Sequence, residues 1–337
     1  MFFYSIQVQI MPSSPPIVTI GNAIVDIIAR ADDQFILDQG MQKSAMNLID
    51  AERASALYDA IGPATEISGG SAANTAVGIV ACGGKAGFIG KISEDMLGRI
   101  FSHDIRAAGV VFTPVYAEGS QTASSTILVT PDTERTMNTH LGASITLGPD
   151  DMDEALIAGA EWVYLEGYLF DAPAGPGCYA RVAEIARSNR TKVAVSLSDA
   201  WCIERHHAAL TAFLADHTDL VFGNEDEILT LFPGSFDDAV TQISDMVEEA
   251  AITLGAAGSL AVRRDSQARV EADNTVRVVD TTGAGDLYAG GYLYARQKGH
   301  DLETAARIAT VAASEVISHI GARPQDDLAQ LIAQYDI

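Results

Sequence analysis

Short β-rich apolar runs alternate with segments of helical spacing along almost the whole chain, and this alternation restricts the fold more than any other feature. The predicted strands are IVTIG from residue 17, GFIG, WVYLEG, KVAVSL, DLVFGN, AITLG, SLAVR and VRVV. Helical spacing separates them at 71–82, 95–107, 177–188, 237–249 and 302–319. Apolar strands separated by helices are typical of a parallel sheet covered on both faces. We therefore expect an α/β protein with three layers, α/β/α, around a mainly parallel sheet.

Two segments, 31–50 and about 112–139, lack the helical spacing found elsewhere. In the second of them, TPVYAEG and SSTILVT are predicted strands with only turns between them. Strands without crossover helices favour antiparallel pairing. We therefore expect these two segments to form a small β-sheet lid outside the central sheet.

The first sixteen residues are predicted to be a flexible extension. They have an apolar start, but no basic residue precedes it, and Pro12, Pro15 and Pro16 interrupt the segment. This pattern fits neither a signal peptide nor a membrane span. No linker divides the remainder, so residues 17–337 are predicted to be a single domain that carries the lid.

Charge and cysteine content exclude several classes of partner. The formal net charge is −24, from 45 acidic and 21 basic residues, which disfavours nucleic acid and anionic membranes as partners. The three cysteines are odd in number, and no two form a C-x-x-C pair. They suggest neither a disulfide framework nor a zinc site, and we expect a cytoplasmic protein.

The segment from Gly283 to Asp286, with the sequence GAGD, follows a predicted strand and precedes a helix predicted at 287–297. Glycines at such a turn let the backbone approach a ligand, and the free N–H groups at the start of the helix favour an anion. A carboxylate beside an anion is repelled unless it has a task, such as accepting a proton from a hydroxyl that attacks phosphorus. The alternative is that Asp286 only caps the helix.

Two other nucleotide-binding motifs do not fit this chain. In a G-x-G-x-x-G fingerprint the third glycine would fall on Tyr288, which excludes that motif at this turn. Gly84-Lys85 and Gly90-Lys91 are each followed by a residue other than Ser or Thr, so neither forms a Walker A loop.

Motifs in four places, in order along the chain, resemble those of the PfkB carbohydrate kinase family, the ribokinase-like kinases. DTTGAGD at 280–286 resembles the C-terminal signature of that family. The N-terminal signature is similar to SGGSAANTA at 68–76 followed by FIGKISEDMLGR at 88–99. FGNEDE at 222–227 contains the N-x-x-E motif, and TLGAAG at 253–258 resembles the loop that lies near the nucleotide. The resemblance runs from about residue 17 to 323 and implies the ribokinase-like fold.

The resemblance implies an ATP-dependent kinase in which Asp286 is the catalytic base for a primary hydroxyl of the acceptor. The amides of Gly283, Ala284 and Gly285 would hold the γ-phosphate. Arg135, in a segment similar to that of adenosine-kinase-like members, would reach the phosphates from the lid.

The N-x-x-E pair, Asn224 and Glu227, would position Mg²⁺ through water. Without the resemblance, NEDE at a helix start indicates capping. On the nucleotide side the resemblance points to Thr253, Gly255 and Gly258. A K⁺ site near Asp280 and Gly321 is a further hypothesis.

The acceptor side is predicted at the other strand ends, where Asn22 and Asp26 follow the first strand and Asn74 opens a helix after Gly69 and Gly70. A carboxylate accepts hydrogen bonds from two vicinal hydroxyls, and glycines allow a sugar ring to approach. Asx turns and simple capping are the structural alternatives.

The quoted segments look most similar to adenosine kinase and the bacterial nucleoside kinases. The predicted activity is phosphorylation of the 5′-hydroxyl of a nucleoside, with adenosine favoured. A ribokinase- or fructokinase-type sugar kinase is the alternative, because a few pocket residues can switch the acceptor on one fold. A non-catalytic binding protein is the third hypothesis. The partner is a small molecule, and the chain is expected to be a monomer or a homodimer.

Overall fold

The computed structural model describes residues 14–132 and 134–335. Most of the predicted extension, residues 1–13, therefore lies outside the described residues. Pro15 is buried, and the carbonyl of Pro16 accepts hydrogen bonds from the amides of Glu161 and Trp162 at 2.8 and 3.1 Å. The packed structure thus already includes the last two residues of that predicted segment.

A nine-stranded sheet forms the centre of the molecule. Seven neighbouring strands are parallel, and two antiparallel strands extend one edge. In spatial order the parallel strands are β7 (Val111–Phe112), β5 (Ala86–Ile89), β1 (Ile17–Ile20), β11 (Trp162–Glu166), β12 (Lys192–Ser196), β13 (Leu220–Asn224) and β14 (Glu249–Thr253), followed by antiparallel β15 (Ser259–Arg263) and β16 (Ser266–Val270). The predicted α/β class with a mainly parallel sheet is confirmed.

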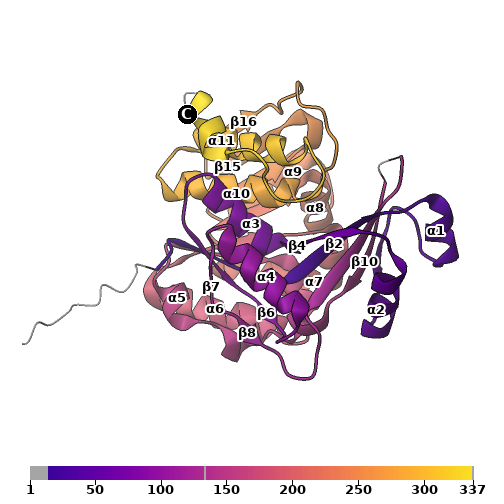
Figure 1. The fold of residues 1–337 in the computed structure, drawn as a ribbon. Helices are drawn as coiled ribbons and strands as arrows, with labels where there is room; N and C mark the ends of the chain where they lie inside the picture. The colour runs from indigo at the N-terminus through magenta and orange to yellow at the C-terminus, as the bar shows by residue number, and fades with distance from the viewer. Residues whose placement is uncertain (1–13, 133, 336–337) are drawn as a thin grey trace, which may run out of the picture.

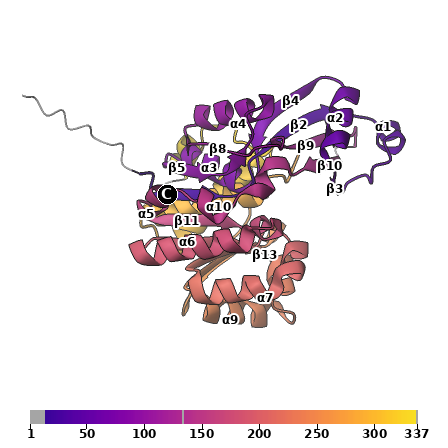
Figure 2. The same ribbon diagram turned by 90° about the horizontal axis from the view of Figure 1, so that it is seen from below.

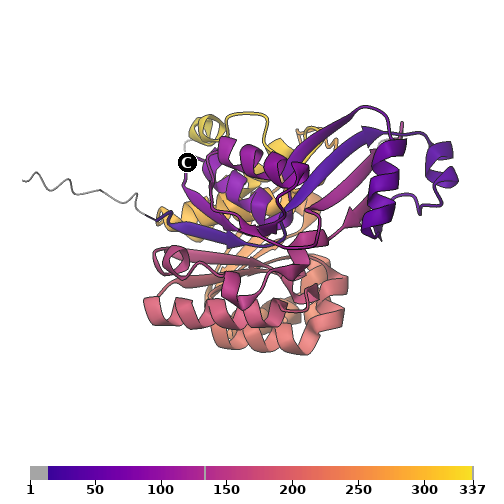
Figure 3. The ribbon, with the colours of Figure 1, turned by 60° about the horizontal axis from the view of Figure 1, so that its bottom comes forward.

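Helices cover both faces of this sheet, as Figures 2 and 3 show. The first face is covered by α3 (Ser71–Ala81), α4 (Met96–Ala107), α10 (Ala284–Gln297), α11 (Leu302–Val316) and α12 (Leu328–Gln334). The second face is covered by α5 (Glu154–Ala158), α6 (Gly175–Asn189), α7 (Ala200–His217), α8 (Glu225–Leu231) and α9 (Phe236–Met246). Short 3₁₀ helices lie at Gly142–Thr146, Pro149–Asp151, Gly167–Asp171 and Gly255–Ala257.

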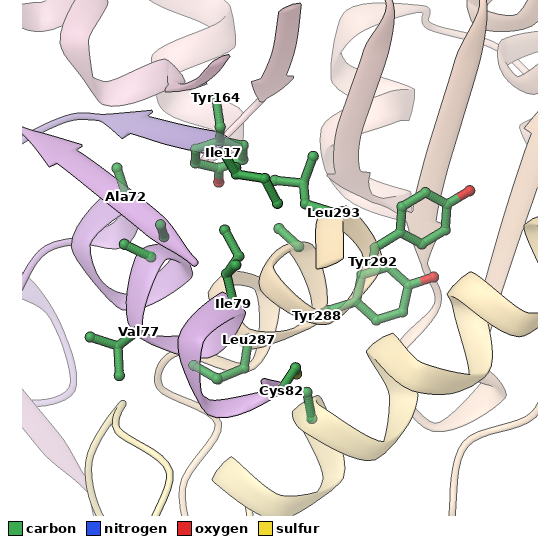
Figure 4. Packing of buried hydrophobic residues seen from close by; sticks show 14 of the residues in the cluster. Ile17, Ala72, Val77, Ile79, Cys82, Tyr164, Leu287, Tyr288, Tyr292 and Leu293 are labelled. Atoms are coloured by element: carbon green, nitrogen blue, oxygen red, sulfur yellow. The ribbon is translucent and has the colours of Figure 1, made fainter. Parts of the chain in front are cut away.

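Alternation along the strands supplies both hydrophobic cores. In β11, Trp162 and Tyr164 pack with the first group of helices, whereas Val163 and Leu165 pack with the second. Successive side chains of a strand point to opposite faces, so a strand buried on both sides is apolar throughout. Figure 4 shows Tyr164 above Leu287 and Tyr292, which come from α10.

The second sheet lies to one side of the central sheet with α1 (Asp33–Asp38) and α2 (Ala51–Ala60) (Figure 1). Its order is β3 (Met46–Leu48), β10 (Arg135–His140), β9 (Ala123–Val129), β2 (Ile24–Arg30) and β4 (Ala64–Gly69). The β2–β9 and β3–β10 pairs are parallel, and the β2–β4 and β9–β10 pairs are antiparallel.

This sheet differs from the expected lid in three respects. It is mixed rather than antiparallel, and it includes β2 and β4, which lie outside the ranges predicted for it. Part of the second predicted range lies elsewhere, because β7 extends the central sheet and β8 (Val115–Tyr116) pairs with β6 (Lys91–Ile92). The pairing partners are distant in sequence, and strand propensity does not encode which distant strands meet.

The run VRVV at 276–279 is not a strand, so that prediction is wrong. The amides of Val279 and Asp280 instead donate to the carbonyl of Ile317 at 2.8 and 3.3 Å. The edge position of the sheet is occupied by β16. Two predicted helices also extended too far, since α9 ends at Met246 and α11 at Val316. No helix of the described chain is long and apolar enough to span a membrane.

Candidate functional site

The site lies where the carboxyl ends of β1 and β11 meet the amino ends of α3 and α10. Glu166 at the end of β11 accepts hydrogen bonds from the amide of Asn22, which follows β1, and from the amide of Ala72 in α3, at 2.7 and 2.8 Å. Ser71, the first residue of α3, contacts Asp286 in α10. The carboxyl ends of parallel strands are the usual place for a ligand in an open α/β sheet.

Asp286 is the third residue of α10, and the N-cap of that helix is Gly283 with φ of 79°. Its Oδ1 accepts a hydrogen bond from the Ser71 hydroxyl at 2.6 Å, and its Oδ2 accepts one from Asn74 Nδ2 at 2.9 Å. Removal from water raises the pKa of Asp286, while the Ser71 and Asn74 hydrogen bonds and the charge of Arg323 lower it. Asp286 is therefore not the N-cap residue of α10, and the geometry leaves its carboxylate facing α3.

Small residues let α3 and α10 approach this closely. A Cβ at Gly78 would lie 2.8 Å from Leu287 Cδ1, and one at Gly290 would lie 2.9 Å from the Thr75 carbonyl. Larger residues at these positions would push the helices apart and separate Asp286 from its two donors. The contact between Ser71 and Asp286, 215 residues apart, depends on this packing.

The start of α10 has the geometry of an anion site. Gly285 is exposed, and a Cβ built on it would meet no heavy atom within 4 Å. Within the described residues, the amides of Gly285 and Asp286 donate to no backbone carbonyl, whereas the amide of Ala284 donates to Thr281 at 3.2 Å. Unpaired amides at a helix N-terminus bind anions. The sequence predicts that the amides of residues 283–285 bind the phosphate. In the structure the Ala284 amide is already paired, and the unpaired amides include that of Asp286.

Arg135 reaches the loop that precedes α10 from the second sheet. Its guanidinium forms an ion pair with Asp280 at 2.6 Å and donates to Thr282 Oγ1 at 2.7 Å. Asp280 also accepts hydrogen bonds from the amides of Thr282 and Gly321 at 3.0 and 2.8 Å. The predicted contact of Arg135 with a phosphate stays a prediction. The K⁺ site near Asp280 and Gly321 also stays a prediction.

A cavity of about 250 Å³ lies between the second sheet and segment 320–325. Its lining contains both polar and apolar residues. The polar residues include Asp26, Asn74, Arg135, Thr282 and Arg323, and the apolar ones include Ile28, Ile67, Ile127, Ile320 and Pro324. Since Asn74 also donates to Asp286, the cavity is adjacent to the predicted base.

Asp26 lies within β2 of the second sheet rather than at the end of the first strand, because the chain leaves the central sheet after Ile20. Burial raises the pKa of Asp26 to about 7, with Arg323 and Arg135 opposing the rise and Asp286 adding to it. A Cβ at Gly69 would overlap the Asp26 carboxylate. Gly70 has φ of 95°, where L side chains are strained, so the backbone requires this glycine, whereas the contact with the Asp26 side chain requires Gly69.

Three residues of this region were missed by the sequence analysis. Glu166 is buried and accepts hydrogen bonds from both the amide and the Nδ2 of Asn22. Burial raises its pKa to about 7. Ser71 holds Asp286, and Arg323 donates to the carbonyls of Ser68 and Ala73. An acid at the end of the predicted strand WVYLEG was the one available signal for Glu166, whereas Ser71 and Arg323 had none.

Asn22 and Asn74, both predicted to bind the acceptor, use their Nδ2 groups within the protein. Asn22 donates to Glu166 at 2.7 Å, and Asn74 donates to Asp286 at 2.9 Å. Their Oδ1 atoms are buried and have no hydrogen-bond partner among the described residues. A buried acceptor without a donor is destabilising.

Asn224 and Glu227 form a capping box at the start of α8. Asn224 accepts from the amide of Glu227 at 2.9 Å, and Glu227 accepts from the amide of Asn224 at 3.0 Å. Burial raises the pKa of Glu227 to about 7. In the described part of the chain, no group of three or more His, Cys, Asp or Glu is arranged to hold a metal ion by itself. The observed hydrogen bonds are those of helix capping. The role of this pair in positioning Mg²⁺ stays a prediction.

Thr253, Gly255 and Gly258 lie at the turn between β14 and β15. Gly255 and Gly258 have φ of 56° and 90°, and a Cβ at Gly258 would overlap the Val270 carbonyl. The turn geometry explains these glycines without a ligand. Their predicted place beside the nucleotide is untested.

An α/β/α core with a smaller mixed sheet beside its carboxyl-end site defines a ribokinase-like protein. Residues 46–328 match the family model described as pfkB family carbohydrate kinase. The chain therefore belongs to the PfkB family and is a kinase, which confirms the family and fold expected from the sequence.

Solved structures and curated relatives agree on the fold but carry different names. The chain is similar to the adenosine kinase of Sinorhizobium meliloti (44% identity, 96% of this chain and 99% of that one, TM-score 0.88). It is also similar to a probable sugar kinase of Rhizobium etli CFN 42 (42% identity, 96% and 99% coverage, TM-score 0.89). The 5-dehydro-2-deoxygluconokinase of Bacillus subtilis (strain 168) is 29% identical over 265 residues, which are 74% of this chain and 80% of that protein.

Proposed function

We propose that this kinase transfers the γ-phosphoryl group of ATP to the 5′-hydroxyl of a nucleoside, with adenosine the favoured acceptor. One observation carries the proposal: Asn74 lines a cavity of mixed polar and apolar residues and donates to Asp286, whose helix begins with unpaired amides. The proposed kinase domain comprises residues 17–337 together with the packed Pro15 and Pro16, and the second sheet forms one wall of the cavity.

In the proposed reaction the acceptor hydroxyl oxygen attacks the γ-phosphorus of ATP, and its proton passes to an Oδ atom of Asp286. A bond forms between that oxygen and the γ-phosphorus, the bond from the γ-phosphorus to the β–γ bridging oxygen breaks, and ADP leaves. Phosphoryl transfer depends mainly on positioning and charge stabilisation. The amides of Gly285 and Asp286 would stabilise the negative charge on the transferred group.

The residues present fit an Mg–ATP complex only through water. Magnesium keeps several waters and takes phosphate oxygens, so the protein need supply only one or two carboxylates. When bound, the ion would neutralise phosphate charge. Glu227, which is buried with its oxygens directed at Asn224, would act through a water held at α8. Such a cation also accounts for ATP binding by a chain of net charge −24.

The lining of the cavity favours a nucleoside over a free sugar. The Asp26 carboxylate would accept hydrogen bonds from two ribose hydroxyls, and the unpaired Oδ1 of Asn74 would accept a third. The apolar residues of the lining, which include Ile28, Ile127 and Pro324, suit the faces of a base. A free sugar would leave that apolar surface uncovered. The 44% identity to a chain named adenosine kinase supports the same choice.

A sugar kinase is the second candidate. The relatives named probable sugar kinase and 5-dehydro-2-deoxygluconokinase favour it, since they share the family and most of the chain length. Phosphorylation of the primary hydroxyl of a sugar acid or a pentose would use the same base and the same anion site.

An ADP-release assay with MgATP tests the proposal against a panel of adenosine, guanosine, inosine, ribose, fructose and 5-dehydro-2-deoxygluconate. We expect turnover with nucleosides and the highest kcat/KM with adenosine. Turnover confined to the free sugars or the sugar acid would show that the second candidate, a sugar kinase, is correct. A binding protein would retain affinity without releasing ADP from any of the six.

The 2′-deoxynucleoside tests the role of Asp26. Loss of one hydrogen bond to a charged group removes about 1.5–3 kcal/mol, so kcat/KM for 2′-deoxyadenosine should fall about 10- to 100-fold. In an Asp26→Ala variant the difference between the two nucleosides should nearly vanish. Equal use of both nucleosides by the unaltered enzyme would remove Asp26 from the ribose hydroxyls.

Ser71→Ala should change the pH profile of the reaction. The Ser71 hydroxyl lowers the pKa of Asp286, so its loss should raise that pKa. Because a general base must be ionised, the acidic limb of kcat/KM should move to higher pH, while activity well above the limb stays closer to that of the unaltered enzyme. Ser71→Thr keeps the hydroxyl and is the matched control. An unmoved acidic limb in Ser71→Ala would show that this hydrogen bond does not tune the base.

A further inference from the structure

Helix α4 lies on the outside of the molecule (Figures 1 and 2). A groove of about 720 Å³ lies along this helix. We call it the α4 groove. It shares no lining residue with the acceptor cavity. Its lining consists of Ser93, Glu94, Gly98, Arg99, Ser102, His103, Arg106, Ala107 and Tyr116.

Four hydrogen-bond donors of the α4 groove lie on one stripe of the helix. Arg99, Ser102, His103 and Arg106 follow the spacing i, i+3, i+4 and i+7, which places them on one face. Glu94 is the one acidic residue of the groove. The groove thus presents two exposed guanidinium groups and an exposed imidazole to a single ligand, and the buried Ser102 lies between them on the same stripe.

The cations of the α4 groove have no ion-pair partner within 4.0 Å in the described residues, although acidic residues outnumber basic ones 45 to 21 in this chain. Arg106 is oriented by a hydrogen bond from its Nε to the Phe112 carbonyl at 3.0 Å and lies over the Phe112 ring. Its terminal nitrogens are left for a ligand.

Ser102 provides an independent observation. Its side chain is 8% exposed, and its Oγ is buried without a hydrogen-bond partner among the described residues. A buried hydroxyl without a partner costs free energy, and turning the Ser102 side chain toward the groove would let a ligand acceptor atom recover it. A phosphate oxygen between Arg99, Ser102 and His103 would be such an acceptor.

We propose that the α4 groove is a regulatory site for a phosphate dianion, either free or as a phosphate monoester. Paired arginines recognise phosphate through charge-assisted and bidentate hydrogen bonds. A polyanion such as nucleic acid is disfavoured by the overall charge of −24, whereas a small dianion meets mainly the local field of the groove.

Helix α4 connects the groove to the acceptor cavity. Asp104, next to His103, accepts hydrogen bonds from the amide and the hydroxyl of Ser68 at 2.8 and 2.6 Å. Arg323 in turn donates to the Ser68 carbonyl at 2.9 Å through Nε, and both residues line the acceptor cavity. A ligand that shifts α4 changes the position of Ser68 and Arg323. This coupling rests on the proposed function, because it assumes that the cavity binds the acceptor. Phosphate binding in the α4 groove does not depend on that assumption.

The binding arm of the test titrates the full chain with inorganic phosphate and with ribose 5-phosphate at constant ionic strength. A saturating non-hydrolysable ATP analogue with Mg²⁺ occupies the anion site of α10. We expect saturable binding that weakens at least about tenfold in Arg99→Ala/Arg106→Ala and in Ser102→Ala combined with Arg99→Ala. Arg307→Ala, which removes an exposed arginine of α11, is the matched control and should bind normally.

The two probes distinguish the sources of the phosphate. Equal affinity for both indicates recognition of the bare dianion, and preference for ribose 5-phosphate indicates a monoester. Equal affinity of the double variant and the unaltered chain for either probe would overturn the site, as would the absence of saturable binding. Thermal unfolding of each variant is measured as a control, and we expect these substitutions to leave the fold intact.

The kinetic arm measures KM and kcat for the acceptor with and without the bound probe. We expect the probe to change KM more than kcat, and we expect Arg99→Ala/Arg106→Ala to lose this dependence while its turnover without phosphate stays unchanged. Binding without any change in KM would overturn the coupling through Asp104. If no acceptor is phosphorylated but the probes bind as expected, the proposed function is wrong and the α4 groove is still a phosphate-binding site.

Discussion

Asp286→Asn should lower kcat by about 10²- to 10⁴-fold, the usual contribution of a general acid or base. The asparagine side chain cannot take up the proton of the substrate hydroxyl. It has nearly the same size as the aspartate that it replaces at the start of α10. The unpaired backbone amides at positions 285 and 286 remain, so binding of ATP and of the acceptor should change little. Steady-state kinetics with titration of both substrates separates the two effects.

The control for this substitution is Asp237→Asn, which alters an exposed acid in the first turn of α9. It should leave kcat unchanged. The side-chain amide introduced by Asp286→Asn cannot accept from both Ser71 and Asn74 as the carboxylate does, so the thermal stability of the variant must be measured alongside. Turnover of Asp286→Asn within a few-fold of the unaltered enzyme would remove Asp286 as the base.

Arg296→Met should destabilise the folded protein by about 3–5 kcal/mol, because it removes the closer of the two cations that pair with a buried carboxylate. The other cation, Arg263, lies 3.7 Å from Glu249. Arg296 in α10 pairs with Glu249 at the start of β14, through Nε to Oε1 at 2.8 Å and Nη2 to Oε2 at 3.0 Å. The Glu249 side chain is 4% exposed and also accepts from the Tyr292 hydroxyl at 2.7 Å. The same helix carries Asp286, so the pair fixes the helix that presents the proposed base. Denaturant unfolding gives the free energy of unfolding for each variant.

Adding Glu249→Gln to Arg296→Met should recover part of the loss, since the glutamine side chain is uncharged and still accepts from Tyr292. Arg181→Met, which breaks exposed ion pairs with Glu154 and Glu184, is the matched control and should have a much smaller effect. A loss in Arg296→Met no greater than that in Arg181→Met would show that the buried pair contributes little.

The sequence was informative where an element is specified locally. Strand β11 was predicted because it is apolar at nearly every position, and α3 because its spacing is helical. The lid was predicted less well, because its strands pair with segments up to about a hundred residues away and in both directions. VRVV has the composition of a strand, yet β16 occupies the edge of the sheet and the amides of Val279 and Asp280 bond to Ile317 instead.

The sequence by itself determined the α/β class, the family, and the residues of the GAGD turn and the N-x-x-E pair, since each depends on residues close together in the chain. Only the tertiary structure decided that Ser71 and Asn74 hold Asp286, that Glu166 holds Asn22 and Ala72, and that Arg323 borders the cavity proposed for the acceptor. The hydrogen bonds among them join residues from 94 to 215 positions apart, and they form only because α3, α10 and β11 pack against one another. Local sequence specifies which side chains are available, whereas burial of the apolar faces of helices and strands determines which of them meet.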